Sequence, residues 1–136
     1  MQSRIIQEIE LLKSQFLDLR HGDKFDWALI QELRLPPERF NRSRVMILFV
    51  IPVGYPQTGP DNFFTDADLR LKEGPMPPAF SRGSQSSSGT APIEGNWGWF
   101  SWHPQSWRPA AMIEGGDNLL TFVRGIKLCL RGEESG

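Results

Sequence analysis

The chain has 136 residues, 39% of them hydrophobic, and its 15 basic and 16 acidic residues give a formal net charge of −1. A chain of this length forms one domain around one hydrophobic core. The near-neutral charge argues against a nucleic-acid partner, because binding to nucleic acid requires basic side chains that neutralise several phosphates.

The sequence also argues against a membrane partner and a metal site. No window approaches the roughly 20 apolar residues of a membrane-spanning helix, and the N-terminus lacks the apolar run of a signal peptide. Cys129 is the only cysteine, so no intramolecular disulfide forms. This agrees with a reducing cytoplasm. One cysteine and two scattered histidines are too few for a zinc site, and we predict no metal or other cofactor.

Residues 3–20 predict an amphipathic helix that begins the domain. Ser3 is the expected N-cap, and His21 with Gly22 the expected end. The apolar residues recur at steps of three and four, which places them on one helical face. They are Ile5, Ile9, Leu12, Phe16 and Leu19.

Two strands are predicted next, in residues 25–36 and 43–56. The first alternates apolar and polar residues, as a half-buried strand does, and the second has a nearly continuous apolar run. The turn residues between them indicate an antiparallel pair. A third short strand is expected within residues 61–71.

Residues 72–96 are rich in proline, glycine and serine, and contain few apolar residues. This composition predicts a long irregular loop that is mobile around SQSSSG. Such a loop is either a tolerated surface insertion or a functional element.

The following stretch, WGWFSWHPQSWRP at residues 97–109, holds four of the five tryptophans. We expect Trp97, Trp99 and Trp107 to line one side of an irregular segment over the sheet, with Trp107 in the core. Trp102 is out of phase with them and is therefore expected to be exposed, where a partner could contact it.

A second helix is predicted from Asp117, its expected N-cap, to Gly132, which ends it. Its core face carries Leu119, Phe122, Val123, Ile126 and Leu130. Cys129 borders this face and is expected to be a small packing residue and not a nucleophile. The order of helix, antiparallel strands, loop and helix predicts an α+β fold.

Two stretches resemble ubiquitin-conjugating enzymes. IPVGYPQTGPDNFF, at residues 51–64, is similar to the segment where a strand ends in Tyr-Pro and a short flap follows. WRPAAMIEGGDNLLTFVRGIKLCL, at residues 107–130, is similar to their Trp-x-Pro element and the following helix. The resemblance covers most of the chain from Phe25 onward and is closest to the prokaryotic ubiquitin-conjugating-like family E.

The resemblance implies a single minimal domain over residues 1–136: an N-terminal helix, an antiparallel meander, an active-site-like loop and a C-terminal helix. It also implies a bacterial conjugation pathway, with a ubiquitin-like protein and a ThiF-type activating enzyme as partners. Tyr55 would begin the flap. With Pro56, Trp99, Trp102 and Trp107, it would help to bind the C-terminal tail of the modifier.

The sequence departs from the family where a conjugating enzyme carries its thioester cysteine. Ser101 stands at about that position, and a His-Pro occurs beyond it at His103. Ser101 has three interpretations: a structural residue, a nucleophile that forms an oxyester with His103 as base, or a serine in place of a natural cysteine. Residues two apart on an extended chain point to one face, and Glu94 and Glu114 are candidates for the carboxylate that orients the base.

Two functions therefore remain open. In the first, the chain receives or positions the C-terminus of the modifier as a conjugating-enzyme-like transferase, with Ser101 and His103 as the catalytic candidates. In the second, it is a non-catalytic adaptor for the modifier or its activating enzyme. His103 also has a purely structural interpretation, in which it packs in a turn, and the tryptophans could instead form a closed small-ligand pocket.

Overall fold

The computed structural model describes residues 3–132. Helix α1 (Arg4–Gln15) begins the fold, and its N-cap Ser3 accepts a hydrogen bond from the Ile6 backbone, as predicted. The helix is shorter than predicted, because Phe16 is its C-cap. Leu19 still reaches the core, and strand β1 (Arg20–His21) forms where the end of the helix was expected.

The predicted antiparallel strands are present. Strands β2 (Trp27–Arg34) and β3 (Arg44–Val50) pair antiparallel, and the expected third strand is β4 (Phe63–Asp66). Two further strands complete the sheet: β5 (Phe80–Arg82) and β8 (Trp97–Phe100). The six-stranded antiparallel sheet has the order β1-β2-β3-β4-β8-β5.

The prediction of an irregular segment over residues 72–96 is wrong in its secondary structure. Strand β5 joins the main sheet, and strands β6 (Gln85–Ser86) and β7 (Gly89–Thr90) form a separate hairpin. Composition hid these strands because they are two or three residues long and are stabilised by their pairing, not by apolar periodicity. Residues 97–100 are likewise a strand and not irregular.

The C-terminal helix α2 (Leu119–Leu130) follows a short 3₁₀ turn, η1 (Ile113–Gly115). Its N-cap is Asn118 and not the predicted Asp117, and Asn118 forms a capping box with Thr121. Asp117 accepts hydrogen bonds from the Arg108 backbone and the Thr121 hydroxyl. Gly132, with φ of 79°, follows the end of the helix as predicted.

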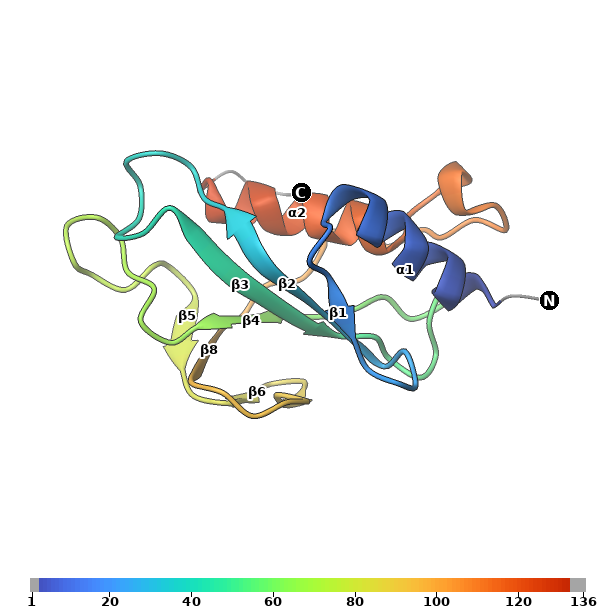
Figure 1. Cartoon of the computed structure of the whole chain (residues 1–136), viewed down its shortest axis with the longest axis horizontal. Helices are drawn as coiled ribbons and strands as arrows, with labels where there is room; N and C mark the ends of the chain where they lie inside the picture. The colour runs from blue at the N-terminus through green and yellow to red at the C-terminus, as the bar shows by residue number, and fades with distance from the viewer. Residues whose placement is uncertain (1–2, 133–136) are drawn as a thin grey trace.

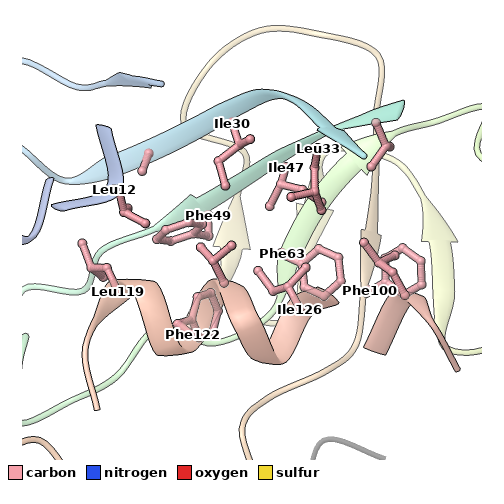
Figure 2. Close-up of a cluster of buried hydrophobic side chains, with 14 of the residues drawn as sticks. Leu12, Ile30, Leu33, Ile47, Phe49, Phe63, Phe100, Leu119, Phe122 and Ile126 are labelled. Atoms are coloured by element: carbon pink, nitrogen blue, oxygen red, sulfur yellow. The ribbon is translucent and has the colours of Figure 1, made fainter. Parts of the chain in front are cut away.

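Both helices cover one face of the sheet, and the β6–β7 hairpin lies on its other side (Figure 1). Figure 2 shows the core between the sheet and α2, where Phe49 and Phe63 point towards Phe122 and Ile126. A smaller cluster occupies the other face and contains Leu29, Leu48, Phe64 and Trp97. We call these the helix face and the segment face.

Candidate functional site

The Tyr-Pro element lies against Trp107 at one end of the helix face. The Tyr55 side chain is buried, and its hydroxyl donates a hydrogen bond to the Glu8 carboxylate. The Trp107 indole donates a 2.7 Å hydrogen bond to the Pro56 carbonyl, and its ring lies 5.9 Å from that of Tyr55. The structure thus brings together three predicted site residues from two distant segments.

The Glu8 carboxylate ties this element to both helices. It is fully buried in α1 and accepts hydrogen bonds from Arg4 Nε at 2.6 Å and from the Leu119 backbone at 2.6 Å. Burial, and then the hydrogen bond and negative charge of Glu8, raise the pKa of Tyr55 far above its usual range. The phenol is therefore a neutral structural donor here and not a proton acceptor.

Asn62, at the end of the flap, joins the flap to two other segments. Its backbone N–H donates to the Trp102 carbonyl at 2.8 Å, and its Oδ1 accepts from the Trp102 backbone at 3.2 Å. Its Nδ2 donates to Ser87 Oγ at 2.9 Å and to Ser88 Oγ at 2.7 Å. Asn62 is buried and has φ of 63°, a conformation that asparagine adopts more readily than most residues.

Ser101 and His103 lie on either side of Trp102, whose backbone is hydrogen-bonded to Asn62. Both are exposed, whereas Phe100 and Trp102, which alternate with them, pack inward. The backbone N–H of Ser101 donates to the Ala79 carbonyl at 2.9 Å, next to strand β5. Both predicted catalytic residues are thus exposed, but within residues 3–132 Ser101 Oγ has no hydrogen bond to His103.

The carboxylate nearest to His103 is one that the sequence did not single out. Asp61 Oδ1 lies 3.9 Å from His103 Nδ1, and Asp61 Oδ2 accepts a 3.4 Å hydrogen bond from Ser88. Neither predicted carboxylate, Glu94 nor Glu114, forms an ion pair with His103 in the part of the chain described. Both side chains of the Asp61–His103 pair are more than half exposed, so solvent weakens their attraction.

The tryptophans are distributed differently from the prediction. Trp97 and Trp99 belong to the segment face, whereas Trp107 packs on the helix face, so the three do not line one side. Trp102 is half-buried and not exposed: its ring lies 5.7 Å from Phe63 and 5.6 Å from Phe122. The alternation of β8 continues past Phe100, so Trp102 lies on the same side as Phe100, and that side is covered by the helices.

A hollow of about 210 Å³ adjoins the site between residues 102–107 and α2. The Trp102 and Trp107 rings line it, together with Phe122 and Gly125. A Cβ at Gly125 would lie 2.9 Å from the Trp102 ring, so the helix approaches this ring closely. Of the four tryptophans in residues 97–109, only Trp102 and Trp107 line this hollow, so the four do not form one closed aromatic pocket.

Three residues of this region escaped the sequence analysis: Glu8, Asp61 and Asn62. Glu8 reads as part of the polar face of α1, and only the fold shows that it is buried. Asn62 carried a usable signal, because an asparagine directly before a strand often occupies a turn with positive φ. Among residues 3–132, no group of acidic, histidine or cysteine side chains is arranged to hold a metal ion, and no helix is long and apolar enough to span a membrane.

The chain has the order helix, meander, Tyr-Pro flap, Trp-x-Pro element and helix. The model of the prokaryotic E2 family E matches its residues 10–133. The chain belongs to this family. No curated protein and no solved structure matches it significantly.

Family membership confirms the predicted minimal E2-like α+β fold. It links the chain to ubiquitin-like conjugation in bacteria, with a ubiquitin-like protein as the general class of partner. Yet residues 97–109 contain no cysteine. Cys129 lies on α2 and packs against the helix-face core.

Proposed function

We propose that this E2-like chain receives or positions the C-terminal tail of a ubiquitin-like modifier along its Ser101–His103 segment. The modifier would be delivered by a ThiF-type activating enzyme. The single cysteine agrees with the reducing cytoplasm as the proposed location of this chain. The observation that carries the proposal is the pair of hydrogen bonds between Asn62 and Trp102, which holds this segment beside the flap.

The binding surface we propose extends from Ser101 to Trp107 and onto the flap. An extended tail placed there would contact the rings of Trp102 and Trp107 at the neighbouring hollow. Trp99 packs against the segment-face cluster, so its expected role in binding would be indirect, through the position of β8. Tyr55 and Pro56 would support this surface through their contacts with Trp107.

Acyl transfer through Ser101 would require a rearrangement of the segment. Ser101 Oγ would attack the activated C-terminal carbonyl of the modifier and form an oxyester, while the bond from that carbonyl to AMP or to a thiol of the activating enzyme breaks and releases that group. His103 would take the hydroxyl proton. The exposed position of both side chains gives access to the carbonyl, but a serine without a hydrogen-bonded base is a weak nucleophile.

The missing contact between Ser101 and His103 favours a second candidate function, that of a non-catalytic adaptor. In this role the chain binds the modifier or its activating enzyme through the same surface, and no bond forms. The preorganised backbone at Trp102 serves both roles, because it fixes the position of a bound tail in either case.

Intact-mass analysis tests these roles after incubation with the cognate activating enzyme, the ubiquitin-like protein and ATP. An adduct on the chain with Ser101 that hydroxylamine removes and that Ser101→Ala abolishes supports the oxyester route. An adduct on Ser101→Cys alone supports a conjugating geometry in which the serine blocks transfer. Binding without an adduct on either chain supports the adaptor, and no binding at all contradicts the proposal.

His103→Gln and Asp61→Asn separate the chemical role of the histidine from tail binding. In the oxyester route, His103→Gln should lower the rate of adduct formation about 100-fold or more, as loss of a general base does. Asp61→Asn should have a smaller effect, since the pair is exposed and its atoms are 3.9 Å apart. The affinity of both variants for the modifier is measured alongside, so that a change in tail binding is separated from a change in the rate of adduct formation.

A further inference from the structure

The connection between β2 and β3, residues 35–43, borders a hollow of about 640 Å³ at the end of the sheet away from the flap. Its apolar wall contains Leu35 and Phe40, which are 4% and 5% exposed. A second hollow of about 320 Å³ shares Leu35 and Pro36 and continues to the C-terminal end of α2. We call the two together the basic hollow, for the charges around it.

Six of the chain's 15 basic residues line this basic hollow. They are Arg34, Arg42, Arg44, Lys72, Lys127 and Arg131. Within residues 3–132, Glu38 is the only acidic residue that lines it, although the whole chain has 16. A chain with a net charge of −1 thus concentrates positive charge at one end, where it attracts anions.

Part of this charge is already paired at the surface. Arg42 lies 2.8 Å from Asp68, and Arg44 lies 2.9 Å from Glu32. Arg34 and Lys72 are exposed and form no ion pair with any residue from 3 to 132. These two side chains are therefore available to a partner without breaking an existing pair.

We propose that the basic hollow binds an acidic segment of a partner protein, with an apolar side chain of that segment against Leu35 and Phe40. Carboxylates of the segment would lie near Arg34 and Lys72. The charges support a peptide over nucleic acid, because the acidic partners of Arg42 and Arg44 would repel a long polyanion.

The basic hollow and the Ser101–His103 segment lie far enough apart to be occupied together. Strand β3 runs from Arg44 beside the hollow to Val50, close to the flap, and its six steps of about 3.3 Å span about 20 Å. Figure 1 shows the β2–β3 connection at the opposite end of the molecule from the η1 loop that follows the site. This interaction does not depend on the proposed function and would add a second partner to it.

A direct binding measurement tests the proposal on the full chain. The probe is a short fluorescent peptide of glutamate, glycine and serine with one central leucine. Fluorescence anisotropy should detect binding that weakens as salt rises. NMR chemical-shift changes should be concentrated in residues 34–44 and around Lys72. A peptide with glutamine in place of every glutamate should bind at least about tenfold more weakly.

Charge reversal gives the decisive comparison. The double variant Arg34→Glu/Lys72→Glu should lose about tenfold or more in affinity for the acidic peptide. Arg20→Glu/Lys24→Glu makes the same change in net charge at exposed positions outside the hollow and should lose less than about twofold. Thermal unfolding of both variants checks that they remain folded.

Three results would overturn the proposal. They are no saturable binding of the peptide, an equal loss in the two double variants, or tighter binding of single-stranded oligothymidylate than of the peptide at the same salt. The last result would assign the basic hollow to nucleic acid. Loss of binding with leucine replaced by serine would confirm that the apolar wall takes part.

Discussion

The helix face and the segment face of the same sheet are buried to very different extents. Among residues 3–132, the helix-face cluster contains 22 buried hydrophobic residues and the segment-face cluster contains four. Two helices close the first, whereas the second is covered by half-buried residues such as Ala91 and Ile93 from the segment before β8. Most of the free energy of folding therefore comes from the helix face.

The candidate site lies where these two layers meet. Strand β8 contributes Trp97 to the segment face and Phe100 to the helix face. Trp102, just after the strand, also packs against the helix face. Asn62 contacts both layers, because its side chain bonds Ser88 in the β6–β7 connection and the Trp102 backbone. The difference between the faces implies that the site is supported by a rigid layer and a more easily opened one.

Truncation of Phe122 should give the largest loss of stability. Phe122 is 1% exposed and packs against Phe49 at 5.1 Å, so Phe122→Ala should lower the free energy of unfolding by about 3–5 kcal/mol. On the segment face, Ile93→Ala should cost about 1 kcal/mol, because Ile93 is only half-buried. Urea denaturation measures both. Equal losses would contradict the comparison of the two faces.

Removal of the Glu8 carboxylate should give the next largest effect. Glu8→Ala leaves Arg4 Nε, the Tyr55 hydroxyl and the Leu119 N–H without their acceptor in a buried site. We expect a loss of about 3 kcal/mol in urea denaturation. Glu8→Gln keeps an acceptor oxygen and should lose less. If Glu8→Ala is neutral, the carboxylate does not tie α1 to α2.

Asn62→Ala should affect the boundary between the faces more than either core. It removes three side-chain hydrogen bonds and places alanine at φ of 63°, which together should cost about 2 kcal/mol. Amide hydrogen exchange should accelerate in residues 85–90 and 101–103 before it does in β2 and β3.

Asn62→Gly serves as the control for backbone strain at this position. Glycine accepts positive φ but has no side chain to bond with. It should therefore show the same local exchange with a smaller loss of global stability. Unchanged exchange in both variants would mean that Asn62 does not support the site.

Alkaline pH should weaken the helix face through Tyr55, the only tyrosine. Its pKa in the folded chain is raised above the ordinary value of 10.0, so the folded state favours the neutral phenol. The stabilisation is complete below that ordinary value and falls as pH rises beyond it, by about 1.4 kcal/mol per pH unit for this group. Urea denaturation from about pH 9 to pH 11 measures the slope.

Tyr55→Phe should lower the steepness of this pH dependence, because phenylalanine has no ionisable group. A tyrosinate absorbance signal in the folded chain near the ordinary pKa would contradict the burial of Tyr55. The segment face contains no tyrosine, so ionisation of a tyrosine should not change its local opening, once exchange is corrected for its intrinsic pH dependence.

The sequence by itself determined the elements whose signals are local. Periodicity predicted α1 and α2, apolar runs and turn residues predicted β2, β3 and β4, and Ser3 was recognised as an N-cap because its hydrogen bond lies within one turn. The Tyr-Pro and Trp-x-Pro stretches indicated the family, which the comparison confirmed.

Only the tertiary structure decided what depends on distant partners. Strand β5 exists because β8 lies beside it, and Trp102 turns inward because Phe63 and Phe122 receive its ring. The burial of Glu8 and the four hydrogen bonds of Asn62 likewise require residues far away in sequence. Periodicity reports which side of an element is apolar, whereas hydrogen bonds between segments depend on how the whole chain folds.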